Sequence, residues 1–391
     1  MTHTDDSAPH LAWQSDGAAH TLRWHSEAGN PPPKRVVEAD DQIPADTAYK
    51  LACEGTGLLW RGDFQNARQL LQALGRRIDR ARERADAKKK AAPKSEAVQP
   101  GHAFHQHRQV QAQRARILGM LLIPVEPGFV IPLRRAPEVQ AACREAYGEP
   151  LAGESFAVSL RELQGLIGAH EWRKKGVAIA ALDGAIHPYY GVFSPVRGEY
   201  VDLVAQAPLP STELAFDIGV GTGVLSAVLA RRGVRKVVAT DMDERALACA
   251  RENLQGLGVL PQVELQKADL FPEGRASLIV CNPPWLPARP SSPIEHAVYD
   301  PDSRMLLGFL KGLGAHLAPG GEGWLIMSDF AEQLGLRAPG MLTEAIAAAG
   351  LEVAARHDIK PRHGKAVDRD DPLHAARSKE TTTLWRLKVR T

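Results

Sequence analysis

The residues best suited to chemistry in this chain are four consecutive ones, Asn282-Pro283-Pro284-Trp285, which follow an apolar run that ends at Cys281. Two prolines fix the backbone and remove two amide donors, so carbonyl oxygens there lack local N–H partners. The Asn282 side-chain oxygen and the Pro283 carbonyl can bind both hydrogens of a planar N–H2 group and direct its nitrogen. This is catalysis by orientation, without a strong base. Trp285 adds a flat surface for a planar substrate.

A glycine-rich loop lies upstream of this tetrapeptide. From Asp217 to Gly223 the sequence is Asp-Ile-Gly-Val-Gly-Thr-Gly, after a strand-like run and before a helix-like one. Glycines there let the backbone turn sharply and let a ligand lie against the main chain. Nicotinamide-binding enzymes use a similar loop with the spacing G-x-G-x-x-G/A. Counted from Gly219, the sixth residue here is Val224, which does not fit that spacing.

Two further acids stand at the ends of the next two strand-like runs. Asp241 ends the first of these runs, and Asp269 ends the second. A carboxylate at the first position can accept both hydroxyls of a ribose, and one at the second can accept from an adenine amino group. Either acid alone is most simply a loop residue or a helix cap. Together with the glycine loop, they predict a cofactor site, and they leave the choice between nicotinamide and methionine cofactors open.

These motifs resemble those of a known group of enzymes. The G-x-G-x-G spacing of Gly219–Gly223, with Asp217 two residues ahead, resembles the first motif of class I S-adenosylmethionine-dependent methyltransferases. Asn282–Trp285 resembles the (N/D/S)-P-P-(Y/F/W) signature of those that modify exocyclic base amines or glutamine amides. Gly191–Ser194 resembles a segment of the methyltransferase small domain group, which includes release-factor glutamine methyltransferases and guanine-N2 methyltransferases of ribosomal RNA. The resemblance covers about residues 185–391.

The resemblance implies S-adenosyl-L-methionine as the cofactor and a role for each motif. The glycine loop would pass under the methionine end of the cofactor, and Asp217 would help to hold its amino group. The sulfonium is a strong methyl donor, so the tetrapeptide would serve the acceptor nitrogen, whose lone pair is delocalised. The predicted catalytic residues are Asn282, Pro283, Pro284 and Trp285, with no metal, and the predicted cofactor-binding residues are Asp217, Gly219, Gly221, Gly223, Asp241, Asp269, Leu270, Phe193 and Asn282.

The segments that must position these residues alternate between strand-like and helix-like runs. This alternation predicts a mostly parallel sheet with helices on both faces. The last two strand-like runs, 352–358 and 381–389, lack a helix between them and are expected to pair antiparallel. The fold class is therefore α/β, a Rossmann-like class I methyltransferase sheet with a smaller α+β N-terminal region. The other expected strands are 214–218, 236–240, 263–268, 277–281 and 323–327, and the expected helices are 224–232, 243–256 and 302–316.

The chain is expected to divide into four segments. Residues 1–85 form an α+β region with a hairpin and an amphipathic helix of about 20 residues from Phe64. Residues 86–103 are a basic linker broken by Pro and Gly. Residues 104–184 form a helical and hairpin region for substrate recognition, and 185–391 form the methyltransferase domain. The segment 104–184 should contain helices at 109–123 and 136–147, one that starts at the capping box Ser159–Glu162, and a hairpin from Val177.

Composition excludes several classes of protein. Hydrophobic residues are 44% of the 391 and the net charge is +2, so a disordered chain is excluded. No apolar run approaches the ~18 residues of a membrane span, and no signal-peptide pattern begins the sequence. The four cysteines form no C-x-x-C pair, and His102, His105 and His107 have no Cys or acid nearby, so no metal is expected. Reduced thiols indicate a cytoplasmic location.

Basic residues concentrate between 80 and 116, with ten Lys or Arg against three acids. Few aromatic residues accompany them, so the segment is expected to contact nucleic-acid phosphates without stacking on bases. The favoured function is N-methylation of an exocyclic base amine of ribosomal or other RNA, or of another nucleic acid. The alternative is a protein glutamine amide, as in release factors or ribosomal proteins, because both reactions use the same catalytic residues. Val224 disfavours a nicotinamide oxidoreductase, and the intact tetrapeptide disfavours an inactive module.

Overall fold

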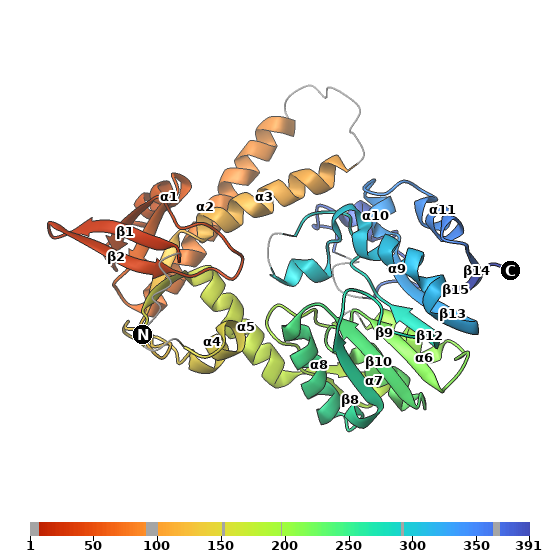
Figure 1. The fold of residues 1–391 in the computed structure, drawn as a ribbon. Coiled ribbons are helices and arrows are strands. Elements are labelled where there is room, and N and C mark those ends of the chain that lie inside the picture. Colours follow the sequence, from red (N-terminus) through yellow and green to blue (C-terminus); the bar gives the residue numbers. More distant parts are fainter. Residues whose placement is uncertain (1–7, 91–100, 151–152, 197, 291–292, 363–367) are drawn as a thin grey trace. The chain divides into compact units, whose positions relative to one another are not determined.

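The chain folds as two compact units in a computed structural model that describes residues 8–90, 101–150, 153–196, 198–290, 293–362 and 368–391 (Figure 1). Unit 1 contains Met1–Gln99 and His105–His170, and unit 2 contains Pro100–Phe104 and Glu171–Thr391. These boundaries differ from those of the predicted segments, because one unit takes residues from both sides of the predicted linker. Residues 91–100 of that linker lie outside the described ranges.

Unit 2 is built on a seven-stranded sheet. The first five strands of its order run parallel, and the last two pair antiparallel, which confirms the predicted α/β class and its antiparallel end. The order is β11 (Val263–Lys267), β10 (Lys236–Asp241), β9 (Leu214–Ile218), β12 (Ala276–Cys281), β13 (Leu317–Ser328), β15 (Thr382–Val389) and β14 (Leu351–Ile359).

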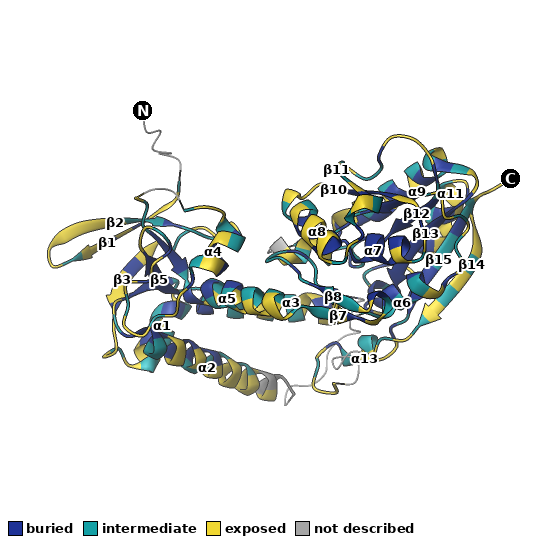
Figure 2. Ribbon diagram, turned by 90° about the horizontal axis from the view of Figure 1, so that it is seen from below, coloured by how far each residue is buried: buried dark blue, intermediate teal, exposed yellow. Residues whose placement is uncertain are grey.

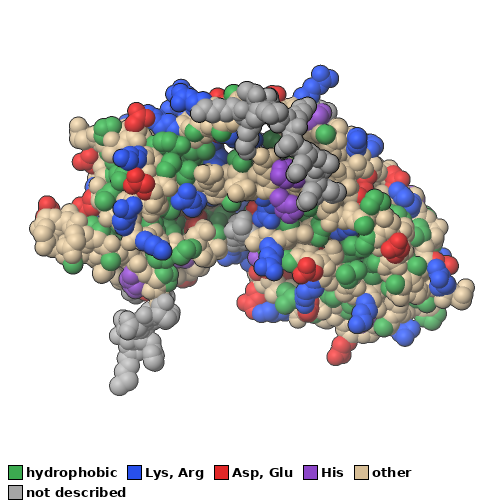
Figure 3. Space-filling view, turned by 90° about the horizontal axis from the view of Figure 1, so that it is seen from above, with side chains coloured by type: hydrophobic (Ala, Val, Ile, Leu, Met, Phe, Trp, Pro, Cys, Tyr) green, Lys and Arg blue, Asp and Glu red, His purple; other side chains and the backbone are tan. Residues whose placement is uncertain are grey.

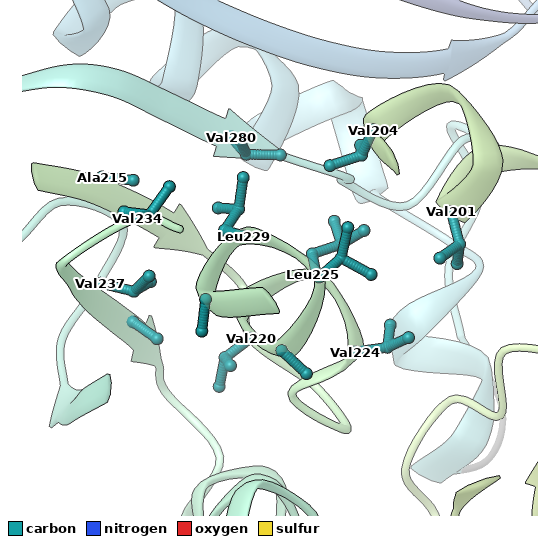
Figure 4. Packing of buried hydrophobic residues seen from close by; sticks show 14 of the residues in the cluster. Val201, Val204, Ala215, Val220, Val224, Leu225, Leu229, Val234, Val237 and Val280 are labelled. Atoms are coloured by element: carbon teal, nitrogen blue, oxygen red, sulfur yellow. The ribbon is translucent and has the colours of Figure 1, made fainter. Parts of the chain in front are cut away.

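Helices cover both faces of this sheet. On β12, Leu278 and Val280 pack into one hydrophobic cluster, whereas Ile279 and Cys281 pack into the other. This period of two is what a strand buried on both faces requires. Figure 4 shows part of the first cluster, in which Leu229 lies near Val280 of β12. The first face carries α6 (Glu199–Gln206), α7 (Val224–Arg231) and α8 (Glu244–Gly256), and the second carries α9 (Arg304–His316) and α11 (Met341–Ala348).

Unit 2 also contains short elements around the sheet. The predicted hairpin from Val177 is present as the antiparallel pair of β7 and β8, although each strand has only three residues. The short elements are β7 (Val177–Ile179), β8 (Gly184–Ile186), α10 (Phe330–Gln333), α13 (His374–Arg377) and the 3-10 turns Ala180–Leu182, Leu260–Gln262, Pro293–Ala297 and Pro301–Ser303.

Unit 1 has a six-stranded mixed sheet. The predicted hairpin is present as β1 and β2, with left-handed Asp16 and Gly17 at its turn. Residues 121–123, which were expected to be helical, instead form part of a strand. That strand is buried along its whole length, so its apolar run lacks the alternation that would separate strand from helix. The order is β1 (His10–Ser15), β2 (Ala18–Trp24), β6 (Phe156–Ser159), β5 (Leu121–Val125), β4 (Thr56–Trp60) and β3 (Arg35–Ala39).

The helices of the N-terminal half differ in length from those expected, and the one predicted at 136–147 is shorter, beginning at Gln140. The amphipathic helix from Phe64 has 27 residues and continues through 86–90, which were assigned to the linker. The capping box is confirmed, because the Glu162 backbone N–H donates to Ser159 Oγ at 3.1 Å. No helix in the described part of the chain is both long and apolar enough to cross a bilayer. These helices are α1 (Ala45–Cys53), α2 (Phe64–Lys90), α3 (His102–Leu118), α4 (Gln140–Tyr147) and α5 (Leu160–Lys175).

Candidate active site

Unit 2 brings the predicted motifs to one end of its sheet. Strands β11, β10, β9 and β12 are neighbours and run parallel, so their carboxyl ends meet on the same side. The glycine loop follows β9, Asp241 ends β10, Asp269 follows β11 and Asn282 follows β12. In open α/β sheets this end is where ligands bind. Phe193, from the segment before α6, is half-buried against the cluster that includes α7.

The glycine loop takes a conformation that only glycine adopts easily. Gly219, Gly221 and Gly223 have φ angles of 79°, 52° and 82°, all in the left-handed region. The backbone N–H groups of Gly219 and Val220 both donate to the Thr240 carbonyl, at 2.9 and 2.8 Å, which ties the loop to β10. A Cβ on Gly219 would lie 2.8 Å from Met305 Cε, whereas a Cβ on Gly221 would meet nothing within 4 Å. The loop is therefore packed at its start and open at its middle.

Asp241 is held in a fixed orientation beside this loop. Its Oδ2 accepts from the Gly221 N–H and its Oδ1 accepts from the Asp243 N–H, both at 3.0 Å. Burial raises the pKa of this carboxyl, and the two backbone donors act in the opposite direction. Each carboxylate oxygen has a further lone pair. The side chain can therefore accept a pair of hydroxyls, as the ribose prediction requires.

Asp217 is the most buried acid of the site, with 1% of its surface exposed. Its position on β9 places it on the same face as Ala215, towards α7, where Ser226 Oγ donates to its Oδ2 at 2.6 Å. Burial raises the pKa of Asp217 to about 6, and the charge of Asp241 adds to this effect. The partner that the structure gives this acid is a hydroxyl of the following helix. Its contact with a cofactor amino group stays a prediction.

Asp269 and Leu270 contribute in different ways. Asp269 Oδ2 accepts from Arg304 Nη2 at 2.6 Å, in an ion pair whose two side chains are both about half or more exposed. Leu270 has a φ of 73°, and its carbonyl accepts from Thr240 Oγ1 at 2.5 Å. Its side chain packs against α9, where a Cβ on Gly308 would come within 2.8 Å of it. Leu270 therefore shapes the turn after β11, while Asp269 keeps its second oxygen available.

The tetrapeptide is positioned by its own tryptophan. Trp285 Nε1 donates to Asn282 Oδ1 at 3.0 Å, and the indole packs against the clusters on both faces of the sheet. A side-chain amide oxygen has two lone pairs, so Asn282 Oδ1 can accept a second hydrogen bond. Among the residues that the structure describes, none donates to the Pro283 carbonyl. The two acceptors that the sequence predicted are thus both able to take an N–H.

Two residues that the sequence analysis did not single out fix the segment after the tetrapeptide. Arg337, 5% exposed, donates through Nη2 to the Trp285 carbonyl at 3.2 Å, and burial lowers its pKa. Asp300 accepts from the backbone N–H groups of Met305 and Leu306 at 3.0 and 3.1 Å. An acid just before a helix-like run could have indicated Asp300 as a cap. No local signal indicates Arg337, which is 52 residues from its partner.

The residues present fit S-adenosyl-L-methionine. Gly221 leaves open space where a side chain would stand, and Asp241 offers oriented lone pairs beside it. Asp269 supplies another acceptor at the neighbouring strand end. When bound, the cofactor supplies an electrophilic methyl group.

Comparisons with known proteins match the part of the chain that contains this candidate site. The family model described as "Methyltransferase small domain" matches residues 187–338, the range that contains every predicted site residue. A release factor glutamine methyltransferase of Cereibacter sphaeroides is 33% identical over 141 residues, 32% of this chain and 50% of its own. The tRNA1(Val) (adenine(37)-N6)-methyltransferase of Shewanella sediminis is 27% identical over 149 residues, 35% of this chain and 61% of its own. The chain thus spans about half the length of these curated relatives.

A third relative is matched over more of its length. It is the provisionally named protein N5-glutamine methyltransferase of Methanocaldococcus jannaschii, 32% identical over 161 residues. The match covers 39% of this chain and 79% of that protein. The chain therefore belongs to the methyltransferase small domain family of class I S-adenosyl-L-methionine-dependent methyltransferases.

Proposed function

We propose that this protein transfers the methyl group of S-adenosyl-L-methionine to a planar nitrogen held by Asn282 and Pro283. The observation that supports this most directly is the pair of acceptors at the end of β12. Asn282 Oδ1 is oriented by Trp285 Nε1 and retains a lone pair, and the Pro283 carbonyl has no donor among the described residues. The pair lies at the same end of the sheet as the glycine loop.

These acceptors address the difficult part of the reaction. The lone pair of an aromatic amine or an amide nitrogen is delocalised, so the nitrogen is a weak nucleophile. Hydrogen bonds from its two N–H groups to Asn282 Oδ1 and the Pro283 carbonyl fix its orientation and increase the electron density on nitrogen. Arg337 keeps this backbone in place through the Trp285 carbonyl. Positioning and electrostatics therefore supply the catalysis.

We propose an exocyclic base amine of RNA, or of another nucleic acid, as the acceptor. The support is a stripe of exposed arginines on α2, namely Arg68, Arg76, Arg80 and Arg84, which are spaced by multiples of four residues. Figure 2 shows that much of α2 is exposed. Among the ion pairs of the described residues, those of α2 involve Arg77 and Asp79 and none involves Arg76, Arg80 or Arg84, so the charges of these three arginines are available to phosphates. Figure 3 shows Lys and Arg side chains on one face scattered among acids rather than gathered in one patch.

Part of the predicted basic segment is used within the protein. Arg114 of α3 pairs with Asp79 of α2, so its charge is offset internally. The side chains of residues 88–90 lie outside the described structure. The proposed phosphate contacts therefore depend on the α2 stripe rather than on the whole segment.

A protein glutamine amide is the second candidate. Its support is the pair of relatives named as glutamine methyltransferases, one of which is matched over 79% of its length. A glutamine amide is also a planar N–H2 group, so Asn282 and Pro283 would bind it in the same way. The tetrapeptide cannot distinguish the two acceptors, because both present the same hydrogens.

The test is transfer of tritium from labelled cofactor to separated RNA and protein fractions of cells that lack this protein. The native protein should label RNA. The Asn282→Ala variant is the matched control and should label RNA about 10²–10³-fold more slowly. Label in protein alone would replace the RNA proposal with the glutamine one. Absence of label from both fractions would contradict N-methylation of either substrate.

A second measurement tests the α2 stripe. Replacing Arg76, Arg80 and Arg84 with Gln should weaken RNA binding and lower its salt dependence by up to about three phosphate contacts. Three exposed glutamines of α3, Gln106, Gln109 and Gln113, replaced with Ala provide the control for surface changes without loss of charge. An unchanged salt dependence in the arginine variant would show that the stripe is only a solvated helix face.

A further inference from the structure

Unit 1 contains a cavity of about 90 Å³ with aromatic walls. Its rings are those of Phe129, Tyr147 and Phe156, together with the imidazole of His25. The residues come from β2, β6, the end of α4 and the turn after β5, so the tertiary fold assembles them. No residue of the cavity belongs to the proposed methyl-transfer site, and the inference below does not depend on that proposal.

The rings meet at steep angles. Phe129, Tyr147 and Phe156 have centroids 6.0–6.2 Å apart and interplanar angles of 60°, 80° and 83°. The His25 ring lies 4.1 Å from Tyr147 at 62°. Two parallel faces would favour a flat guest such as a nucleobase. Rings that enclose a corner instead offer several electron-rich faces to a compact cation.

The wall formed by Phe129 is maintained at a cost in backbone energy. Phe129 has a φ of 62°, directly after Gly128 with a φ of 76°. The left-handed region is unfavourable for a bulky side chain. The turn is closed by two hydrogen bonds between Glu126 and Val130, at 2.7 and 3.2 Å. This turn places an aromatic ring in the cavity wall where a glycine or asparagine would satisfy the backbone more easily.

Charges around the cavity favour a cation over an anion. Glu149 and Glu154 line it, against a single cation, Arg23, which already pairs with Glu154. Arg144 lies 3.6 Å from Glu149, which is 84% exposed and highly solvated. Behind the rings, the Tyr147 hydroxyl donates to Glu162 Oε1 at 3.1 Å, which enriches the electron density of that ring. Among the lining side chains, a phosphate or nucleotide would meet the carboxylate of Glu149 and no cation that is not already paired.

We propose that the cavity binds the cationic head group of an Arg or Lys side chain on a polypeptide partner. The aromatic corner supplies cation–π attraction, and Glu149, the lining carboxylate that Arg23 does not pair with, supplies charge complementarity. The volume admits one side-chain head group and its stem. A polypeptide with a protruding basic residue is therefore the partner that this surface suits.

Small probes test the chemistry on the full chain. Aromatic resonances of protein with ¹³C-labelled Phe and Tyr would be followed during titration with N-acetyl-arginine amide and N-acetyl-lysine amide. The neutral isostere N-acetyl-citrulline amide and adenosine monophosphate serve as comparisons. The cationic probes should give saturable shifts of Phe129 and Tyr147, and should bind at least about 5-fold more tightly than the citrulline probe. Equal binding of citrulline, or tighter binding of the nucleotide, would overturn the proposal.

Variants test the walls of the cavity separately. Tyr147→Leu should weaken binding of the arginine probe about 5-fold through loss of a ring face, and Glu149→Gln about 2-fold through loss of a solvated charge. Glu83→Gln, on an exposed position of α2, is the matched control and should bind as the native protein does. Because Glu149 is exposed, its variant keeps the packing if Tyr147→Leu fails to fold. Native-like binding by both folded cavity variants would overturn the proposal.

Discussion

The two units both contain a sheet, but the sheets gather functional groups in different ways. In unit 2, four neighbouring strands run parallel, so residues separated by up to 65 positions, from Asp217 to Asn282, reach the same end. In unit 1, antiparallel pairs interrupt the order at β1–β2 and β5–β6, so the carboxyl ends of the six strands do not all lie at one end of the sheet. Parallel strands thus bring the loops at their carboxyl ends to one site. The cavity of unit 1 is instead formed by side chains from strands, a helix end and a turn.

The two sites also differ in how their charges are placed. Asp217 of unit 2 is buried beside a second acid, whereas Glu149 of unit 1 is exposed to solvent. A buried charge interacts strongly with its neighbours, and an exposed one is screened. Substitutions in the site of unit 2 should therefore change activity, stability or binding more than substitutions in unit 1.

The largest effect is expected from Asn282→Ala. The single-turnover rate should fall about 10²–10³-fold, because a preorganised acceptor is lost, while cofactor affinity and melting temperature stay close to native. Trp285 also loses the acceptor of its indole N–H, so Trp285→Phe, which removes the same hydrogen bond but keeps a flat ring, is the comparison and should be mild. Asn282→Asp should retain more activity than Asn282→Ala. A lower melting temperature with a native rate per molecule would assign Asn282 a structural role instead.

The second-largest effect is expected from Asp217→Asn, which should change how the free energy of unfolding depends on pH. Its pKa is about 6 in the folded state and near 3.8 when unfolded, so the native state holds the proton more tightly and stability falls as pH rises from about 4 to 6. Asp217→Asn keeps an acceptor for Ser226 and removes this penalty. The variant should gain up to about 3 kcal/mol in free energy of unfolding at pH 7.5, and little near pH 4. Urea unfolding of the ligand-free protein at both pH values measures the difference.

If Asp217→Asn changed the free energy of unfolding equally at the two pH values, the link between stability and the protonation of Asp217 would be contradicted. The same variant should bind cofactor more weakly if Asp217 holds the amino group, as the sequence predicts. Calorimetry with S-adenosylhomocysteine separates this role from the effect on stability.

A smaller loss is expected for cofactor binding by Asp241→Asn. The amide can accept on one atom only, so one ribose hydroxyl and one backbone N–H compete, and binding of S-adenosylhomocysteine should weaken by about 1–3 kcal/mol. Asp243→Asn is a matched control, because it removes the same charge two residues away and asparagine also caps α8 well. Calorimetry that gives equal affinities for the two variants would remove Asp241 from the cofactor site.

The smallest effect tests whether the units act separately in binding. Replacing Arg76, Arg80 and Arg84 with Gln should leave cofactor affinity within about 2-fold of native. These side chains are solvated and belong to unit 1. Calorimetry on the triple variant measures this. A change of 10-fold or more would show that the two units are coupled in cofactor binding.

Much of unit 2 could be predicted because its signals are local. The glycine loop and the prolines of the tetrapeptide restrict the backbone over a few residues, and short apolar runs mark each strand. Unit 1 was less predictable. The run 121–125 fits a helix or a buried strand equally well, and pairing of β5 with β4 and β6 selects the strand. Strands β3 and β4 were not predicted, although prolines 31–33 precede the first and Gly55 precedes the second, because each apolar run is only a few residues long.

The sequence by itself determined the fold class, the family resemblance and the residues at the carboxyl ends of β9 to β12, because each depends on residue types at short spacing. Only the tertiary structure decided which partners those residues have. Ser226 reaches Asp217, Arg304 reaches Asp269, and Arg337 reaches the Trp285 carbonyl across 52 residues. These contacts form when helices pack onto a sheet, and the packing of distant segments leaves no local pattern in the chain.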